Sequence, residues 1–205
     1  MISFTCFSPH PPLLLPDVGS QEDRKKVKKT IQSLNILGKK IKETNSDCII
    51  ISSPHPDWGF NVPLYFLNPE NRIPNRQFLI PDKEPAFYFQ RGKQFYNGLE
   101  KDKKYAFIAS GDMSHCLAED GPYGFNPDGP KFDQDFIESL KRKDINNILN
   151  LDDKYPQAGE CGLRSFSFIL GILESAKINW QPEILSYESP FGVGYLVVNF
   201  KFDNK

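Results

Sequence analysis

The chain has three histidines, and each of them follows a segment with the composition of a buried strand. The segments read FTCFSPH, IIISSPH and FIASGDMSH, and they end at His10, His55 and His115. In an open α/β sheet, ligands bind where several loops meet at the carboxyl ends of the strands. A single histidine in such a place is usually structural, but three in the same setting predict imidazoles that converge on one site.

The loops that carry the first two histidines share the sequence Ser-Pro-His-Pro, at residues 8–11 and 53–56. Proline fixes φ, so these loops are expected to hold their side chains in one place. Two neutral histidines and one carboxylate bind a divalent ion and leave coordination positions open, an arrangement typical of non-haem Fe(II) oxygenases. The pattern therefore predicts that His10 and His55 bind a metal ion.

The carboxylate that would complete such a site is less clearly indicated. The acidic residues near motif-like sequence are Asp17, Asp57, Asp112, Glu119 and Glu160. Glu160 stands in AGECGLRSF, between two glycines and just before an apolar helix, a setting that could bring a carboxylate inward. Alternatively, Glu160 is an ordinary acidic residue in the first turn of a helix, where the helix dipole stabilises a negative charge.

Strands and helices alternate along the chain. Strands are predicted at residues 2–7, 47–53, 104–110, 183–187 and 193–202, with a short edge strand at 77–80. Helices are predicted from Ser20 to residue 41 and at 84–100, 132–141, 144–151 and 160–175, and residues 119–131 are expected to form a structured loop. This order predicts one α/β domain over residues 1–205, with a central, mostly parallel or mixed sheet that helices cover on both faces.

Composition narrows the function classes. The chain has 25 Lys and Arg against 26 Asp and Glu, so no basic surplus indicates nucleic acid or an anionic membrane as a partner. No stretch approaches the roughly 18 consecutive apolar residues of a membrane span, and the first residues lack the basic region of a secretory signal. The cysteines are widely spaced, without a C-x-x-C pair, which favours reduced thiols in a cytoplasmic protein.

Six runs together resemble the LigB-type, class III extradiol ring-cleavage dioxygenase family. They are FSPHPPLLLPDVG, SSPHPD, ASGDMSH, EDGPYGFNPDGPKFD, AGECGLRSF and SYESPFGVGYLV, and the resemblance extends over nearly the whole chain. Within the family, the chain is most similar to the branch related to Memo and to the AmmeMemoRadiSam system protein B group. The resemblance implies a single dioxygenase domain that inserts O2 into a small catecholic or aminophenolic substrate.

Carried over residue by residue, the resemblance implies that His10, His55 and Glu160 bind Fe(II) and that His115 is the acid/base. An imidazole with an ordinary pKa of about 6.5 can take a proton from a substrate hydroxyl and return it near neutral pH. Trp58 and Asp112 are the candidate substrate-binding residues. The partners expected are thus a small aromatic compound and O2. Association into a homo-oligomer is an open alternative.

Two departures from the family pattern keep an alternative function open. Relatives have a long segment after the second ligand histidine and a histidine where Trp58 stands here. Memo-like relatives also carry a cysteine in place of the carboxylate, and Cys161 is beside Glu160. A thiolate favours copper or zinc, so the alternative is a Memo-like module that binds copper, iron or zinc without ring cleavage. A zinc hydrolase is a third reading, because the same ligands can activate water.

Overall fold

The computed structural model describes residues 1–203 and has one six-stranded sheet, in the order β3-β2-β4-β1-β6-β5. The first four strands of this order run parallel, β6 is antiparallel to β1, and β5 is antiparallel to β6. The strands are β1 (Ile2–Ser8), β2 (Cys48–Ser53), β3 (Asn75–Leu79), β4 (Tyr105–Ser110), β5 (Trp180–Glu188) and β6 (Tyr195–Phe202). The predicted single α/β domain with a mostly parallel, mixed sheet is confirmed.

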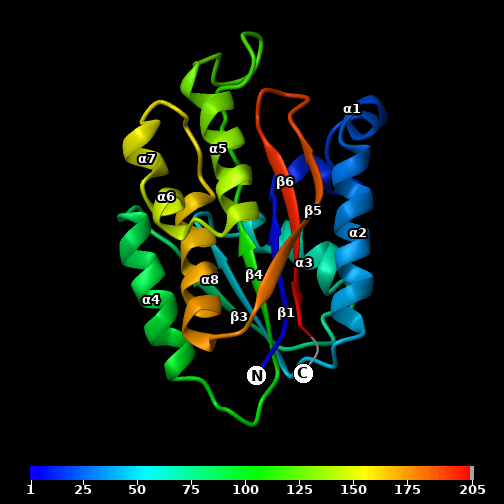
Figure 1. The fold of residues 1–205 in the computed structure, drawn as a ribbon. Coiled ribbons are helices and arrows are strands. Elements are labelled where there is room, and N and C mark those ends of the chain that lie inside the picture. Colours follow the sequence, from blue (N-terminus) through cyan, green and yellow to red (C-terminus); the bar gives the residue numbers. More distant parts are fainter. Residues whose placement is uncertain (204–205) are drawn as a thin grey trace.

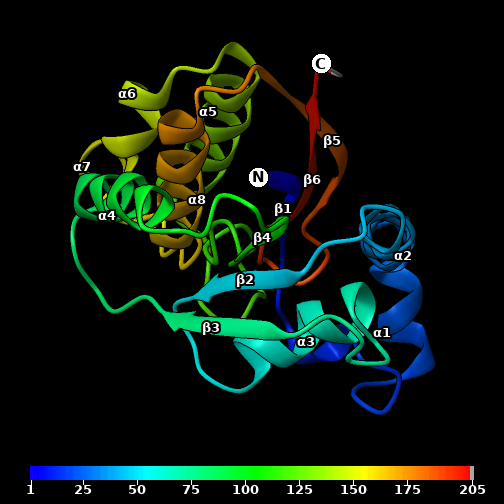
Figure 2. The ribbon, with the colours of Figure 1, turned by 90° about the horizontal axis from the view of Figure 1, so that it is seen from below.

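Helices cover both faces of the sheet (Figures 1 and 2). One face carries the short 3-10 helix η1 (Pro12–Leu14) with α1 (Gln21–Lys26), α2 (Lys28–Lys42) and α3 (Trp58–Leu67). The other carries α4 (Pro85–Asn97), α5 (Asp128–Arg142), α6 (Ile145–Leu149), α7 (Leu151–Lys154) and α8 (Leu163–Ala176). Each face therefore has its own hydrophobic core.

The two cores explain why the parallel strands have continuous apolar runs rather than alternating ones. In β1, Phe7 packs in the core under α8, whereas Phe4 and Cys6 point to the core under α2. In β2, Ile50 faces the first core and Ile51 the second. Successive side chains of a strand point to opposite faces, so a sheet that is covered on both sides needs apolar residues at every position.

Most predicted elements are present, and the differences have local causes. Ser20 caps α1 and forms a reciprocal capping box with Asp23, but the helix predicted to residue 41 is interrupted at Val27. The helix predicted at 144–151 is two short helices, α6 and α7. Helix α3 was not expected, because its sequence contains Gly59 and Pro63, which both disfavour a helix interior.

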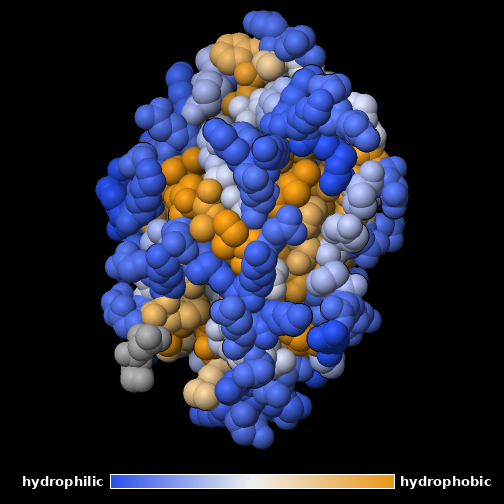
Figure 3. All heavy atoms as spheres, turned by 90° about the vertical axis from the view of Figure 1, so that its right-hand side faces the viewer, coloured by the Kyte–Doolittle hydropathy of each residue, from blue (hydrophilic) through white to orange (hydrophobic). Residues whose placement is uncertain are grey.

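The outer surface of α1 and α2 is mainly hydrophilic. Figure 3 shows this side of the molecule, where polar side chains cover most of the surface and apolar ones show between them. Ile36 on α2 is the most exposed of its large apolar residues, at 44%. Within residues 1–203, no helix combines the length and apolarity needed to cross a bilayer.

Candidate metal centre

Three neighbouring strands end level with one another and carry the candidate site. Ser8 of β1 pairs with Ser110 of β4, and Ser52 of β2 pairs with Ala109, so Ser53 is level with Ser110. His10, His55 and Asp112 each follow the last serine of their strand by two residues. This common register brings three loops to one edge of the sheet.

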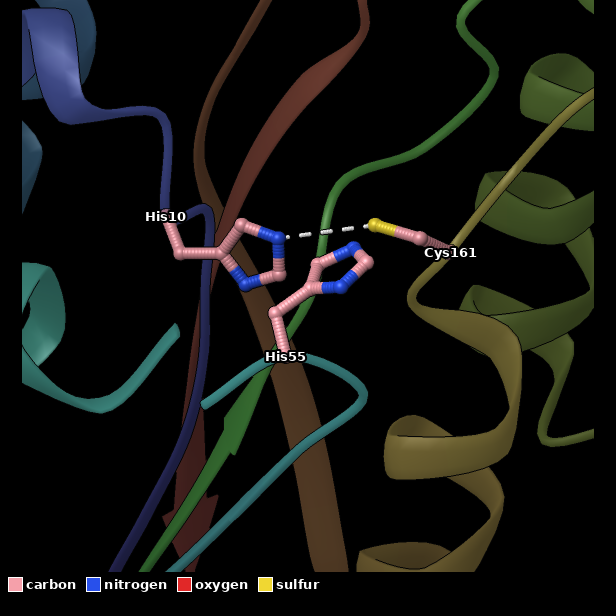
Figure 4. Close-up of side chains that lie close together, drawn as sticks. All are labelled: His10, His55 and Cys161. Carbon is pink, nitrogen blue, oxygen red and sulfur yellow. Dashed lines mark hydrogen bonds between the residues drawn. The ribbon is translucent and has the colours of Figure 1, made fainter. Parts of the chain in front are cut away.

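Side chains from two of these loops meet a third from the segment before α8. His10, His55 and Cys161 each offer a nitrogen or sulfur atom, and these three atoms lie within 4.8 Å of one another. The His10 and His55 rings are 5.2 Å apart between centroids and nearly perpendicular, at 71°. Figure 4 shows the two imidazoles and the thiol directed at the same point. Two imidazoles and a thiolate are a donor set that fits iron, copper or zinc.

Hydrogen bonds fix which nitrogen of His10 is free to bind a cation. Nδ1 of His10 lies 2.9 Å from the hydroxyl of Ser110. The Ser110 hydroxyl donates its only proton to the carbonyl of Gly59, so it must accept from Nδ1. The proton of the neutral imidazole therefore stays on Nδ1. The lone pair on Nε2 faces Cys161, whose Sγ is 3.5 Å away.

The carbonyl of Gly59 is available to Ser110 because of a proline in α3. In an α-helix, the carbonyl of residue 59 would accept the N–H of residue 63, but Pro63 has none. The first turn of α3 also packs so closely on β2 that a Cβ at position 59 would lie 2.1 Å from Oγ of Ser53. Gly59 and Pro63, which made this helix hard to predict, thus hold the Ser110 hydroxyl in place.

Burial keeps His10 neutral. Only 2% of its surface is exposed, and this burial, with the nearby His55, lowers the pKa of His10 to about 3. Its backbone N–H donates to Oδ1 of Asp112 over 3.0 Å. Nε2 is 3.8 Å from Oδ2 of the same carboxyl group, which is a contact with a neutral imidazole rather than an ion pair. A neutral imidazole is the form that binds metals.

Two glycines bring Cys161 to the ends of the strands. Gly111 approaches Gly162 so closely that a Cβ at position 111 would lie 2.2 Å from Cα of Gly162. The N–H of Gly162 donates to the carbonyl of Asp112 over 2.9 Å, and the N–H of Asp112 points at Sγ of Cys161, 3.3 Å away. Burial raises the pKa of the Cys161 thiol well above its usual value. A bound cation offsets that cost, because thiols bind metals as thiolates.

Glu160, the predicted carboxylate ligand, has other partners. Its carboxylate accepts the N–H of Leu163 over 2.6 Å and pairs with Arg164 over 2.9 Å. Burial raises the pKa of Glu160 to about 7. Among the described residues, the groups of potential ligands around the histidines contain Cys161 and not Glu160. Ligation by Glu160 stays a prediction, and it requires the carboxylate to leave the first turn of α8.

His115 belongs to a second group of potential ligands that shares Cys161, and it has a free nitrogen. Asp112, His115 and Cys161 form a second group whose potential ligand atoms lie within 4.8 Å of one another. Nε2 of His115 is buried and makes no hydrogen bond to the rest of the described chain. Burial is the largest influence on this imidazole and lowers its pKa, while Asp112 opposes the shift. His115 is thus a neutral base beside the donor cluster.

The two candidate substrate-binding residues have different surroundings. Trp58 is 43% exposed, and its ring stacks on His55 with centroids 5.5 Å apart. Asp112 is 5% exposed, and burial raises its pKa to about 6. Trp58 is therefore accessible to a ligand beside His55. Asp112 supports the backbone of His10 and adjoins Cys161, which makes it part of the wall of the site.

A cavity of about 420 Å³ opens beside the cluster. It is lined by Pro54, His55, Ile80, Pro81, Asp82, Asp152, Tyr155, Pro156, Ala158, Gly159, Glu160, Cys161 and Arg164. Its size suits a single aromatic ring with a short substituent.

Sequence reasoning did not find Arg164 or Ser110. For Arg164, the available signal was its position four residues after Glu160 in the helix predicted at 160–175. No local signal marked Ser110.

Comparisons with known proteins agree with this architecture. The family model described as the catalytic LigB subunit of aromatic ring-opening dioxygenase matches residues 55–198, which include His55, His115, Glu160 and Cys161. A crystal structure of uncharacterized protein JW3007 from Escherichia coli K12 superposes with a TM-score of 0.60 at 13% identity. The match covers 96% of this chain and 99% of that one, so the fold is shared.

A curated relative matches over most of this chain. Protein CA_C1420 from Clostridium acetobutylicum is 30% identical over 267 aligned positions, which cover 94% of this chain and 56% of that protein. This chain thus spans about half the length of that relative. The alignment is longer than the 205 residues here, so the relative has residues within the matched region that this chain lacks. With a family model that matches well over half of its residues, the chain belongs to the family of the catalytic LigB subunit of aromatic ring-opening dioxygenases.

Proposed function

We propose that the chain is a metal-dependent, extradiol-type dioxygenase in which His10, His55 and Cys161 hold Fe(II). The observation that carries the proposal is the lone pair of a buried, neutral His10, which faces His55 and Cys161 at the edge of a cavity. Membership of a ring-opening dioxygenase family supports the reaction class. The substrate is a small catecholic or aminophenolic compound, and O2 is the second substrate.

Bound by these donors, Fe(II) would bring the substrate oxygens and O2 together and pass electron density between them. The protein side chains orient the ring and move the proton. His115 is neutral near pH 7, and its free Nε2 can accept the proton of a substrate hydroxyl and return it after the ring opens. Trp58, stacked on His55, offers an aromatic surface to the ring.

Oxygen uptake by the iron-loaded chain tests this function. The protein is loaded with Fe(II) without air, mixed with a panel of catechols and aminophenols, and then exposed to O2. We expect uptake of one O2 per ring opened, with at least one compound, at a rate roughly 10²- to 10⁴-fold lower in the iron-loaded His115→Ala variant. Absence of uptake with every compound, in protein that retains its iron, would contradict the proposal.

The position of Cys161 supports a second candidate, a metal-binding module related to Memo that does not cleave rings. A thiolate beside two imidazoles favours softer ions, so this module would hold copper or zinc. Purified protein that carries one equivalent of copper or zinc and shows no O2 uptake after exchange for iron would favour it. Loss of that metal in Cys161→Ser would place the ion at this cluster.

A further inference from the structure

One wall of the cavity beside His55 and Cys161 is charged, and its single described arginine is surrounded by carboxylates. Each of the three guanidinium nitrogens of Arg164 lies near a different carboxylate. One terminal nitrogen is 2.9 Å from Glu160 and the other is 3.4 Å from Asp152, and both contacts are hydrogen bonds. Nε is 2.9 Å from Asp82, an ion-pair contact without hydrogen-bond geometry. A ligand carboxylate that sought Arg164 would have to displace one of these partners.

The wall has an excess of negative charge. Arg164 is the only Lys or Arg among the described residues that line the cavity, whereas Asp82, Asp152 and Glu160 all line it. Asp82 and Asp152 alone outnumber the arginine, so the sign of the excess does not depend on the charge of Glu160. An anionic substituent at this wall meets repulsion, and the one described lysine or arginine side chain that lines the cavity already lies beside three carboxylates.

The carboxylate of Asp82 is the one most available to a ligand. Its side chain is 91% exposed although it pairs with Arg164, while the side chain of Asp152 is 26% exposed. Asp82 precedes α4 and Asp152 belongs to α7, so two separate segments present carboxylates to the same cavity. A positively charged group in the cavity meets the exposed carboxylate of Asp82 and the partly exposed carboxylate of Asp152, which both lie beside the same arginine.

We propose that this cavity selects catechols whose substituent is a short alkylammonium group and rejects catechols whose substituent is a carboxylate. This inference rests on the proposed dioxygenase function, in which the hydroxyl groups of the ring lie toward His55 and Cys161. The substituent then points to the wall formed by Asp82, Asp152 and Arg164. Charge at that wall decides which ring is accepted.

Three matched catechols test the selection. They carry at the same ring position a 2-aminoethyl, a propyl or a 2-carboxyethyl substituent, and they are titrated without O2 into the full, iron-loaded chain by calorimetry. We expect the aminoethyl compound to bind about tenfold more tightly than the carboxyethyl compound, with the propyl compound between them. Added salt should narrow the difference, because the wall is partly exposed. Equal binding, tighter binding of the carboxylate, or no binding of any of the three would overturn the inference.

Charge-neutral variants identify the residues responsible. Asp82→Asn combined with Asp152→Asn should reduce the preference for the ammonium compound to about threefold or less. Asp153→Asn is the matched control, because Asp153 is the neighbour of Asp152, is exposed, and does not line the cavity. An unchanged preference in the double variant would overturn the assignment. Binding in the expected order without O2 uptake would contradict the dioxygenase function and leave the charge selection standing.

Discussion

The hydroxyl of Ser110 lies 2.9 Å from Nδ1 of His10 and fixes the tautomer of that imidazole. Its own proton is donated to the carbonyl of Gly59, which Pro63 leaves without its usual helical partner. A residue in β4 and two residues in α3 therefore determine that Nε2 of His10 presents a lone pair to the metal site. The predictions below follow from this arrangement and from its neighbours.

Ser110→Ala should weaken metal binding more than it weakens the fold. The change leaves Nδ1 of His10 buried without an acceptor and frees the ring to adopt the other tautomer. Loss of such a supporting contact lowers metal affinity by roughly 10- to 100-fold. Competition with a metal chelator measures the affinity, and Ser167→Ala is the control, because Ser167 is a buried serine on α8 away from the cluster. Equal affinity in the two variants would contradict the role of Ser110.

Pro63→Ala should have opposite effects on stability and on metal binding. Alanine restores an N–H that can donate to the carbonyl of Gly59, so α3 is expected to gain up to about 3 kcal/mol, less the apolar contacts that the proline made. The same N–H competes with the Ser110 hydroxyl, so metal affinity should fall. Urea unfolding and chelator competition measure the two quantities. A variant with raised stability and unchanged affinity would show that Ser110 does not depend on Gly59.

Asp133 predicts how stability depends on pH. This aspartate is 1% exposed, and it accepts hydrogen bonds from the N–H of Ser114 and the hydroxyl of Tyr187. Burial outweighs these bonds and raises its pKa from 3.8 to about 7. The unfolded chain loses this proton at lower pH than the native protein, so the carboxyl group lowers the free energy of unfolding as pH rises from about 4 to about 7. The loss is on the order of 4 kcal/mol.

Asp133→Asn isolates this effect, because asparagine keeps a hydrogen-bond acceptor and does not titrate. The free energy of unfolding of both proteins is measured by urea at about pH 5 and about pH 8. The decrease between the two pH values should be smaller in the variant by several kcal/mol. Parallel pH dependences in the two proteins would mean that Asp133 is not protonated in the native state.

His115→Ala should separate metal binding from turnover. Its imidazole has a free nitrogen next to the cluster, but His10, His55 and Cys161 can bind an ion without it. We expect iron content close to that of the unaltered chain and a turnover rate lower by roughly 10²- to 10⁴-fold, as is typical when an acid/base group is lost. Metal analysis and O2 uptake on the same sample measure both. Loss of iron in this variant would reassign His115 as a ligand.

The positions of the histidines could be predicted because they depend on local sequence. An unbroken apolar run followed by serine and proline indicates a doubly buried strand that ends in a stiff loop. Strands β1 and β2 end in this way, and β4 ends in serine followed by glycine. Their common register then follows from parallel pairing. Helix α3 could not be predicted in the same way. Its Gly59 and Pro63 oppose helix formation locally, and packing against β2 compensates for them.

The choice between Glu160 and Cys161 also depends on long-range contacts. The two residues are neighbours, so only the direction of the chain decides which side chain faces the histidines. That direction follows from the contact between Gly111 and Gly162, which are 51 positions apart in the sequence. The local pattern left five acidic residues as candidates, and the family resemblance assigned the role to Glu160. In the folded chain, that carboxylate contacts the N-terminus of α8 and Arg164, and its ligation of a metal stays a prediction.

Metal binding by two variants distinguishes Cys161 from Glu160 as the third ligand. Cys161→Ser and Glu160→Gln are each titrated with Fe(II) without air and with Co(II), whose thiolate complexes have a characteristic charge-transfer absorption. We predict that Glu160→Gln binds both ions nearly as the unaltered chain does and keeps the absorption band, and that Cys161→Ser loses the band and at least about tenfold in affinity. Retained affinity in Cys161→Ser with loss of binding in Glu160→Gln would contradict the account and make Glu160 the third ligand.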